Sequence, residues 1–368
     1  MLVVGAGLSG ATIARELAEK GYKVTIIEKR NHIAGNCYDY VNHAGILMNK
    51  YGAHLFHTNS ERVWSYVQKF SEWVPWKHKV SGCIDGVYFP IPVNIDTVNK
   101  LCDTKIQTEV EMKEWLTKNT IACDTPRNSE DIGLARVGPV LYDKIFKGYT
   151  FKQWDKFPAE LAPSVLERIP IRTNWDPYYF SDKYQALPKK GYTPMVASML
   201  DHPNIRVHLE TEYSKEMNSK YTSIFYTGPI DTYFSEAGYD KLEYRSIRFE
   251  EETLDMDIFD PRGSVINYPS LNEPYTRIIE YKHFLNQQVP GKTTIVKEYS
   301  TAEGEPYYPV PTERNQALYK KYQELTLQEK NVFFVGRLAN YKYYNMDAAI
   351  LAALECVDNY FKSLDIRA

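Results

Sequence analysis

The pattern that most constrains the fold lies in the first 30 residues. A short apolar run at residues 2–4 is followed at once by Gly5-Ala6-Gly7-Leu8-Ser9-Gly10, and residues 11–20 then carry apolar side chains at helical spacing. A second apolar run at residues 24–27 ends on Glu28. This order of strand, glycine turn, helix, strand and acid predicts a βαβ unit that binds a dinucleotide.

Each part of this unit has its own role in binding a dinucleotide. Gly5 allows a tight turn, Gly7 lets the backbone approach a pyrophosphate, and Gly10 lets the helix pack closely on the strand. The N-terminus of the helix offers free N–H groups to the anion. Glu28 stands where a ribose hydroxyl needs an acceptor. These residues do not separate FAD from NAD.

Composition narrows the range of functions. The 368 residues, of which 43% are hydrophobic, can form two or three domains. A net charge of −3 argues against a general nucleic-acid binder. Five widely spaced cysteines without a C-x-x-C motif argue against a disulfide framework or a zinc site. No apolar run is long enough to span a membrane, and the chain enters its first strand without a signal peptide, so we expect a cytoplasmic protein.

The spacing of His54 and His57 raises the question of a metal site. No third ligand with matching spacing follows them, and Gly52 just before them indicates a loop. We therefore expect no metal. We expect one of the two histidines to face the cofactor rather than both to bind only backbone groups.

The middle of the chain predicts a hairpin followed by helices. Asp85-Gly86 is typical of a two-residue hairpin turn. Helical apolar spacing is present in residues 96–102, 110–119 and 132–147. Residues 146–154 are aromatic and cationic, and we expect them to form a loop that covers a base or a sugar.

The second half predicts a helix and then an antiparallel sheet. Thr193 as the N-cap and Pro194 at the first position predict a helix over residues 195–200. Apolar and polar residues alternate in residues 241–250, 264–268 and 275–282, as they do in strands with one covered face. Arg277 lies in one of these strands, where it can bind a ligand or pair with an acid such as Glu280.

The C-terminal part repeats the order of strand, glycine and helix. Residues 332–335 are apolar, Gly336-Arg337 follow, and residues 348–360 have helical spacing. Flavoproteins commonly complete their cofactor site with such an element. The repeat therefore favours FAD over NAD and places both ends of the chain in one domain.

Several longer segments resemble a known family. They include Tyr-Gly-Ala-His-Leu-Phe-His-Thr at 51–58, Gly-Tyr-Thr-Phe-Lys-Gln-Trp at 148–154 and Gly-Arg-Leu-Ala-Asn-Tyr-Lys-Tyr-Tyr at 336–344. Further matching segments are residues 27–33, 179–185, 226–231, 275–280 and 305–309. Together they are similar to bacterial UDP-galactopyranose mutases, and the similarity runs nearly from end to end of the chain.

The resemblance implies an isomerase that interconverts UDP-galactopyranose and UDP-galactofuranose without net redox change. In that family the N5 atom of reduced FAD attacks the anomeric carbon, and UDP departs and later returns. The resemblance also implies an external reductant such as NAD(P)H, a homodimer, and a role in supplying galactofuranose to cell-surface glycans.

The resemblance assigns roles to individual residues. The catalytic residues would be His57 against the flavin and Arg168 and Arg277 on the diphosphate, because guanidinium groups stay charged and can bind phosphate with two N–H groups. The other substrate-binding residues would be Phe146, Tyr149, Trp154, Tyr179, Tyr308, Tyr343, His78 and Asn345. The residues that bind FAD would be Gly5, Ala6, Gly7, Ser9, Gly10, Glu28, Lys29, Asn36, His54, His57, Arg337 and Met346.

Two details of this assignment stay open. Asn345 stands where the family usually has an aspartate, so the change either tunes the substrate preference or is compensated by Asp347. Tyr307 would replace Tyr308 if the strand were shifted by one residue, because such a shift turns every side chain to the other face.

We expect an α/β fold with three parts. The first is a Rossmann-like FAD-binding domain from residues 1–77, 188–234 and 326–368. The second is a helical domain, residues 95–155, with a mobile substrate flap that includes Trp154. The third is an antiparallel sheet domain for the substrate, from residues 78–94, 156–187 and 235–325.

Three alternatives to this function stay open. A flavin-dependent oxidoreductase of the amine-oxidase type would share the FAD domain, but it does not predict two arginines among several tyrosines. The same mutase chemistry could act on UDP-N-acetylgalactosamine or on an arabinose nucleotide. A protein that binds flavin or a UDP-sugar without turnover is the third alternative.

Overall fold

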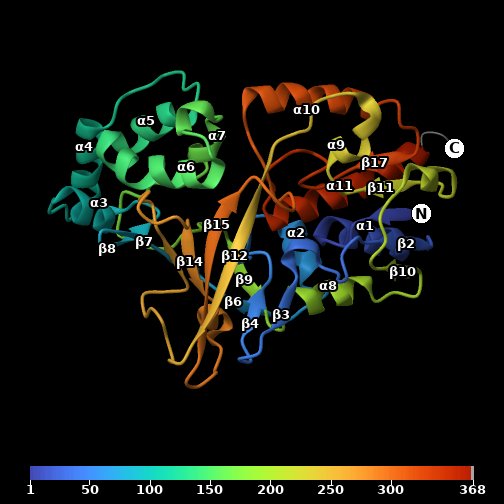
Figure 1. Cartoon of the computed structure of the whole chain (residues 1–368), viewed down its shortest axis with the longest axis horizontal. Coiled ribbons are helices and arrows are strands. Elements are labelled where there is room, and N and C mark those ends of the chain that lie inside the picture. Colours follow the sequence, from blue (N-terminus) through green and yellow to red (C-terminus); the bar gives the residue numbers. More distant parts are fainter. Residues whose placement is uncertain (366–368) are drawn as a thin grey trace.

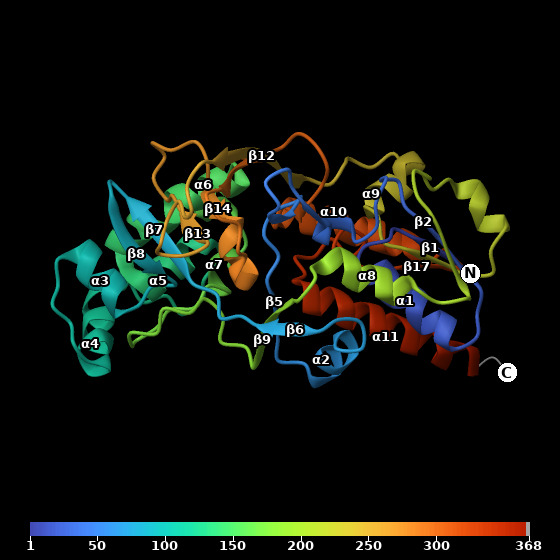
Figure 2. The ribbon, with the colours of Figure 1, turned by 90° about the horizontal axis from the view of Figure 1, so that it is seen from below.

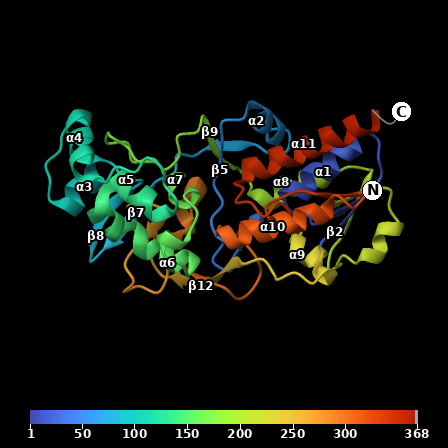
Figure 3. The same cartoon turned by 90° about the horizontal axis from the view of Figure 1, so that it is seen from above.

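The computed structural model describes residues 1–365, which form an elongated molecule (Figure 1). A parallel sheet with the N-terminus lies on the right of Figure 1, and a group of helices from residues 95–167 lies on the left. Long strands connect the two. The views from below and from above show the same order along the long axis (Figures 2 and 3).

A five-stranded parallel sheet contains the predicted βαβ unit. Its strands run in the order β10-β2-β1-β11-β17. They are β1 (Leu2–Val4), β2 (Val24–Ile27), β10 (Ile205–His208), β11 (Ile224–Tyr226) and β17 (Val332–Phe334). Leu2 of the central strand pairs with Thr25 on one side and with Ile224 on the other. Strands from the start, middle and end of the chain therefore lie side by side.

Helices cover both faces of this sheet. Val3 and Phe225 belong to a buried cluster on the face covered by α1, α8 and α11, whereas Leu2 and Ile224 belong to a cluster on the face covered by α9 and α10. The helices are α1 (Leu8–Glu19), α8 (Tyr192–Leu200), α9 (Ile230–Tyr233), α10 (Glu313–Thr326) and α11 (Met346–Asp365). Because successive strand residues point to opposite faces, strands that are apolar throughout are buried on both.

A second sheet of seven strands crosses the middle of the molecule, in the order β16-β12-β15-β14-β13-β7-β8. Its strands are β7 (Val80–Ile84), β8 (Val87–Ile91), β12 (Tyr244–Leu254), β13 (Val265–Asn267), β14 (Arg277–Glu280), β15 (Thr293–Thr301) and β16 (Tyr308–Pro309). The sequence predicts an antiparallel sheet, but β13 and β7 pair in parallel. The difference arises because β7 enters from a remote part of the chain rather than through a hairpin.

The helical segment differs from its prediction in one helix. Its helices are α3 (Ile95–Cys102), α4 (Glu109–Asn119), α5 (Ser129–Leu141), α6 (Gly148–Trp154) and α7 (Ser164–Glu167). Residues 132–147 do not form one helix, because α5 bends at Gly138-Pro139, ends at Leu141 and gives way to a π-helix, Tyr142–Lys147.

Residues 146–154 are helical and not the loop that their composition suggests. They form the end of the π-helix and all of α6. Phe146 and Trp154 are only 8% and 4% exposed, and they share a buried cluster with Ile279 of the seven-stranded sheet. Aromatic residues that resemble a flap in sequence thus pack into a core. The same core joins the helices to the sheet, and the division into three domains stays a prediction.

The start of α8 shows how a distant residue can cap a helix. The predicted N-cap, Thr193, lies inside the helix, which begins at Tyr192 after Gly191. The N–H groups of Tyr192 and Thr193 donate to the carboxylate of Asp39 at 2.5 and 2.9 Å. Asp39 lies in β3 (Asp39–Val41), which pairs with β4 (Leu47–Asn49). A local capping rule cannot identify a cap supplied from another strand.

A three-stranded sheet links the two halves of the molecule. It consists of β5 (Phe56–Thr58), β9 (Tyr184–Pro188) and β6 (Trp73–Pro75), and α2 (Glu61–Val67) follows β5. Residues 184–188 form the central strand of this sheet. His57 of β5 lies directly opposite Gln185.

The contact between Gly10 and Gly5 generates a stability prediction. A Cβ atom added at Gly10 would lie 1.9 Å from the carbonyl oxygen of Gly5, and this backbone cannot move without distorting the turn. We expect Gly10→Ala to lower the free energy of unfolding by about 2–3 kcal/mol, measured by urea denaturation. The matched control is Gly7→Ala, since its Cβ would meet nothing closer than Gly35 Cα at 3.7 Å. A Gly10→Ala variant as stable as Gly7→Ala would contradict the role of close packing.

Candidate active site

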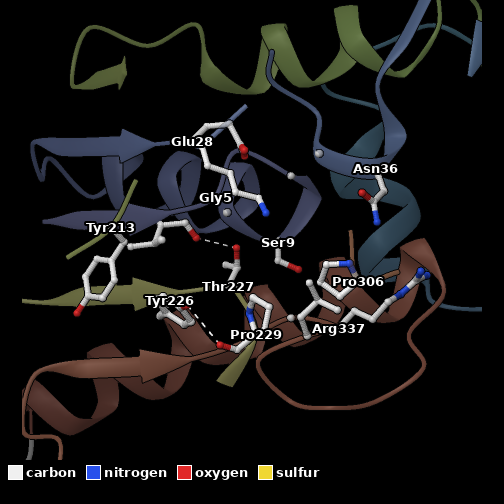
Figure 4. Close-up of a pocket in the computed structure, with 18 of the residues that line it drawn as sticks. Gly5, Ser9, Glu28, Asn36, Tyr213, Tyr226, Thr227, Pro229, Pro306 and Arg337 are labelled. Carbon is white, nitrogen blue, oxygen red and sulfur yellow. Dashed lines mark hydrogen bonds between the residues drawn. The ribbon is translucent and has the colours of Figure 1, made fainter. Parts of the chain in front are cut away.

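An elongated cavity of about 650 Å³ opens at the carboxyl ends of the parallel strands. Its wall comes from the segments that follow four of the strands: residues 5–10 after β1, 28–30 after β2, 227–229 after β11 and 336–338 after β17. Figure 4 shows Tyr213 at one end, with Asn36 and Arg337 at the opposite end. This edge of an open α/β sheet is where such folds bind nucleotides.

The glycine turn is shaped to hold an anion. Gly7 is the N-cap residue of α1 and supplies no side-chain cap, so the first N–H groups of the helix remain available to a ligand. Glu28 is 7% exposed and lines the cavity. Its two carboxylate oxygens accept N–H bonds from Ala6 at 2.9 Å and Arg30 at 3.0 Å, which fixes the side chain and leaves lone pairs for a ligand hydroxyl.

The end of the cavity opposite Tyr213 carries the positive charge of Arg337. The guanidinium of Arg337 donates to the backbone carbonyl of Tyr344 and, at 3.4 Å, to that of Tyr307. His54 also lines this end, and its Nδ1 lies 2.7 Å from the carbonyl oxygen of Gly52. Burial, reinforced by the charge of Arg337, lowers the pKa of His54 to about 4. His54 is therefore neutral near pH 7, and Arg337 supplies the charge.

Most of the residues assigned to the cofactor line this cavity. They are Gly5, Gly7, Ser9, Gly10, Glu28, Lys29, Asn36, His54, Arg337 and Met346, and Asn345 lies beside them. Ala6 and His57 do not line the cavity, and the backbone N–H of Ala6 donates to Glu28. The assignment omitted Thr211, Tyr213 and residues 227–229, which also line the cavity. Gly228, two residues after the end of β11, was the sequence signal for the last group.

A cluster of arginines and tyrosines adjoins the cavity through Arg337. The guanidinium carbon of Arg168 lies 4.4 Å from the centre of the Tyr343 ring, and that of Arg337 lies 5.3 Å from the same ring. Tyr308 stacks on Tyr343 with ring centres 5.4 Å apart. Burial alone would raise the pKa of the Tyr343 phenol, but the nearby guanidinium groups lower it below its ordinary value. The cluster therefore has an excess of positive charge suited to an anion.

Arg277 is held in this cluster by a buried acid. Its Nε donates to Glu298 at 2.6 Å across neighbouring strands, and Glu298 is 2% exposed. The alternative partner, Glu280, instead binds His283, Thr293 and backbone N–H groups. Because Glu298 occupies Nε, the two terminal nitrogens of Arg277 can serve a ligand.

Three further predicted phenols, Tyr149, Tyr179 and Tyr308, join Tyr343 in this cluster. Burial raises the pKa of Tyr149 to about 12, although the charge of Arg277 acts in the opposite direction. Burial also raises the pKa of Tyr179, against the charge of Arg168. Tyr308, and not Tyr307, lies beside Tyr343, since Tyr307 turns toward Tyr51 at 6.0 Å. These phenols stay protonated near neutral pH and can donate hydrogen bonds.

His57 and His78 lie near the cluster but make different contacts. The Nδ1 atom of His57 is 3.0 Å from the carboxylate of Asp182, and its ring stacks on Phe180 with centres 3.8 Å apart. His78 is 3% exposed, and its Nδ1 has no hydrogen-bond partner. Asp182 was not predicted as a site residue, because only the pairing of β5 with β9 brings it to His57.

Two of the residues assigned to the substrate lie in the core. Phe146 and Trp154 pack with other apolar side chains of the helical segment. Across residues 1–365, no group of three or more His, Cys, Asp or Glu side chains could hold a metal ion. No helix in the described part of the chain is long and apolar enough to cross a membrane.

Comparisons with known proteins agree with this geometry. The family model for UDP-galactopyranose mutase matches residues 144–343, and that for an NAD(P)-binding Rossmann-like domain matches residues 3–70. A Klebsiella pneumoniae protein named "Probable UDP-galactopyranose mutase" is 40% identical, with 99% of this chain and 95% of that protein covered. The dTDP-fucopyranose mutase of Escherichia coli is 37% identical, with 99% and 98% covered.

Solved structures extend the comparison to three dimensions. The crystal structure of a reduced UDP-galactopyranose mutase matches with a TM-score of 0.79, covering 98% of this chain and 95% of that one, at 16% identity. The fold and the cavity thus define a Rossmann-like, dinucleotide-binding enzyme. The full-length relatives and the family model go further, because the chain belongs to the UDP-galactopyranose mutase family, whose members are isomerases.

The buried His78 generates a prediction about pH. Burial, followed by the charges of Arg277 and His57, lowers the pKa of His78 to about 3 from an ordinary 6.5. Below pH 6.5 His78 therefore binds a proton in the unfolded chain but not in the folded chain. We expect the free energy of unfolding to fall from pH 6.5 toward pH 3, with a slope of up to about 1.4 kcal/mol per pH unit from this group.

The variant His78→Gln isolates this contribution. It should remove the contribution of His78 to the slope of unfolding free energy against pH. The difference in unfolding free energy between wild type and variant should then be constant above pH 7 and shrink below pH 6. Urea denaturation at several pH values measures it. The exposed His43 supplies the control, because His43→Gln should follow the wild type at every pH. A difference between wild type and His78→Gln that is independent of pH would contradict the prediction.

Proposed function

We propose that this protein interconverts UDP-galactopyranose and UDP-galactofuranose with reduced FAD bound in the cavity. The observation that carries the proposal is the meeting of Arg168, Arg277, Arg337 and four phenols beside a dinucleotide-type cavity. A nucleotide diphosphate needs such an array of fixed cations and neutral donors. Membership of the mutase family supports the mutase over a flavin oxidoreductase.

The residues of the cavity fit FAD. The free N–H groups at the start of α1 suit its pyrophosphate, and the fixed carboxylate of Glu28 suits a ribose hydroxyl. Arg337 lies at the opposite end from Tyr213 and would adjoin the flavin, and His54, whose pKa is lowered partly by the charge of Arg337, would do so beside it. When bound and reduced, FAD supplies a nucleophile for the anomeric carbon.

The chain itself would hold UDP while the sugar changes its ring. Arg277, oriented by Glu298, would offer its two terminal nitrogens to phosphate oxygens. Arg168, at the end of α7, would do the same. Tyr179, Tyr308 and Tyr343 would donate further hydrogen bonds. Because UDP leaves as an anion, these charges are aimed at where negative charge develops. Retaining UDP lets the same molecule bond again to the rearranged sugar.

His57, which lies outside the lining of the cavity, would adjoin the flavin from beyond that wall and with a defined orientation. The carboxylate of Asp182 holds its Nδ1, and Phe180 supports the flat face of its ring. This contact would fix the proton on Nδ1 and leave Nε2 as an acceptor. Asp182 thereby supports the role assigned to His57.

A second substrate deserves a direct comparison. The E. coli relative named dTDP-fucopyranose mutase aligns over nearly the whole chain. Asn345 stands at the edge of the cavity, where an amide in place of a carboxylate can alter contacts to sugar or nucleoside. The second candidate is therefore the same ring contraction on dTDP-fucopyranose, and UDP-N-acetylgalactosamine remains the third.

The proposal extends to the setting of the enzyme. We infer a cytoplasmic homodimer that is reduced by a donor such as NAD(P)H and supplies galactofuranose for cell-surface glycans. These points are supported by family membership and by the free state of the five cysteines.

Chromatography of the reaction products tests the activity. We expect purified protein to convert UDP-galactofuranose to UDP-galactopyranose with dithionite and not without it, because only the reduced cofactor is nucleophilic. Parallel incubations with dTDP-fucopyranose and UDP-N-acetylgalactosamine rank the substrates. Conversion of none of these by reduced protein that retains its flavin would refute the proposed function.

Arg277→Lys tests the diphosphate site. Lysine keeps the charge but loses the planar fork and the bond to Glu298, so we expect UDP affinity to fall by about 10- to 100-fold. Isothermal titration calorimetry measures the affinity. The control is Arg262→Lys, because Arg262 contacts Asp260 and Tyr88 away from the cluster. Equal UDP affinity in the two variants would show that Arg277 does not hold the diphosphate.

A further inference from the structure

Lys152 of α6 is enclosed by backbone carbonyl groups. The carbonyl oxygens of Tyr268, Ser270, Glu273 and Tyr275 lie 2.5, 2.6, 2.9 and 2.9 Å from its Nζ, so its three N–H groups are shared among four acceptors. All four acceptors belong to residues 268–275, the connection between β13 and β14. One cation thus gathers four of the eight carbonyl groups of residues 268–275 around a single point.

The surroundings of Lys152 show that this contact is built into the fold. A Cβ atom added at Gly148, at the start of α6, would lie 2.6 Å from the carbonyl oxygen of Pro269, so only glycine allows the helix to approach the connection. Burial lowers the pKa of Lys152 to about 8, and Glu273 opposes the shift. A carboxylate oxygen of Glu273 is itself buried without a hydrogen-bond partner. The ammonium therefore supplies hydrogen-bond donors to four carbonyl groups of a segment whose tip, residues 271–272, is exposed.

The last turn of α6 is attached to the seven-stranded sheet as well. The carbonyl oxygen of Gln153 accepts hydrogen bonds from Arg245 Nε at 3.2 Å and from Ser300 Oγ at 2.5 Å. Arg245 lies in β12 and Ser300 in β15. The helix is thereby fixed both to the strands and to the connection that leads into β14.

This double attachment sets the relation between two groups of the proposed diphosphate site. Tyr149 lies three residues before Lys152 on α6, so the two share one side of the helix. Arg277 lies two residues after Tyr275, the last carbonyl that Lys152 binds. The connection thus joins the helix that carries Tyr149 to the strand that carries Arg277, so its attachment to α6 bears on the distance between the phenol and the guanidinium.

We propose that Lys152 is a positioning residue, which sets the geometry of Tyr149 and Arg277 by locking the 268–275 connection onto α6. Lys152 would act through these two residues and would not touch the substrate. The inference rests on the proposed function, because it assigns both residues to binding the nucleotide diphosphate.

The test compares Lys152→Met with Lys147→Met. Methionine keeps most of the stem and removes the ammonium, whereas Lys147 is an exposed lysine of the preceding π-helix that pairs with Asp143. UDP affinity, KM, kcat, flavin content and Tm are measured for each variant. We expect Lys152→Met to weaken UDP binding by about tenfold, with a matching rise in KM and flavin content equal to wild type. Lys147→Met should match the wild type in all of these.

Two further variants separate positioning from a loss of folding. Lys152→Gln retains two N–H donors, so it should recover part of the UDP affinity, and it replaces Lys152→Met if that variant does not fold. In a double-mutant cycle with Tyr149→Phe, the two losses of affinity should be clearly less than additive, because both act on the same contact.

The outcomes distinguish this inference from the proposed function. UDP affinities of Lys152→Met and Lys152→Gln equal to that of the wild type would overturn the role of Lys152, and so would fully additive losses in the cycle. Failure of the wild type and of Lys147→Met to bind UDP at all would instead refute the proposed function.

Discussion

The structure depends on a buried carboxylate at the point where positive charge is concentrated. Arg168, Arg277 and Arg337 all lie close enough to the Tyr343 phenol to lower its pKa. Without a ligand, such cations repel one another, and solvent at the exposed Arg168 and Tyr343 screens part of this repulsion. Glu298, buried beneath Arg277, offsets part of this repulsion and keeps the guanidinium in a single orientation. The arginines of this cluster therefore favour the binding of an anion, and the neighbouring phenols Tyr149, Tyr179 and Tyr308 add uncharged hydrogen-bond donors.

The two sheets divide the chemistry between them. The parallel sheet ends in loops whose N–H groups and carboxylate suit a dinucleotide, because the carboxyl ends of its strands meet at one edge. The seven-stranded sheet carries Arg277 and Glu298 on neighbouring strands, and the helices attached to it carry Tyr149 and Arg168. Arg337, which follows β17, belongs to both groups. The site thus lies where the two sheets meet. Its geometry depends on attachments such as the contacts of Lys152 with the carbonyl groups of residues 268–275.

Sequence reasoning succeeded where the signal was local and periodic. The glycine turn, Glu28 and the C-terminal Gly336-Arg337 could be placed in one cofactor cavity because a parallel sheet brings strand ends together whatever the loops between them. It failed where a residue's partner is remote. Thr193 resembles an N-cap, yet Asp39 satisfies the helix. Residues 146–154 resemble a loop, yet they are helical, and Phe146 and Trp154 are buried, because composition alone does not fix where an aromatic ring packs.

The sequence by itself determined the class of protein: the order of strand, glycine and helix at both ends dictates a Rossmann-like domain, and the motifs along the chain identify the mutase family. Only the tertiary structure decided the partners of the functional groups. Glu298 rather than Glu280 holds Arg277, Asp182 holds His57, and four carbonyl groups hold Lys152. The physical reason is that charge and hydrogen bonding act over a few ångströms, and distances of that size between remote residues are set by sheet pairing and packing.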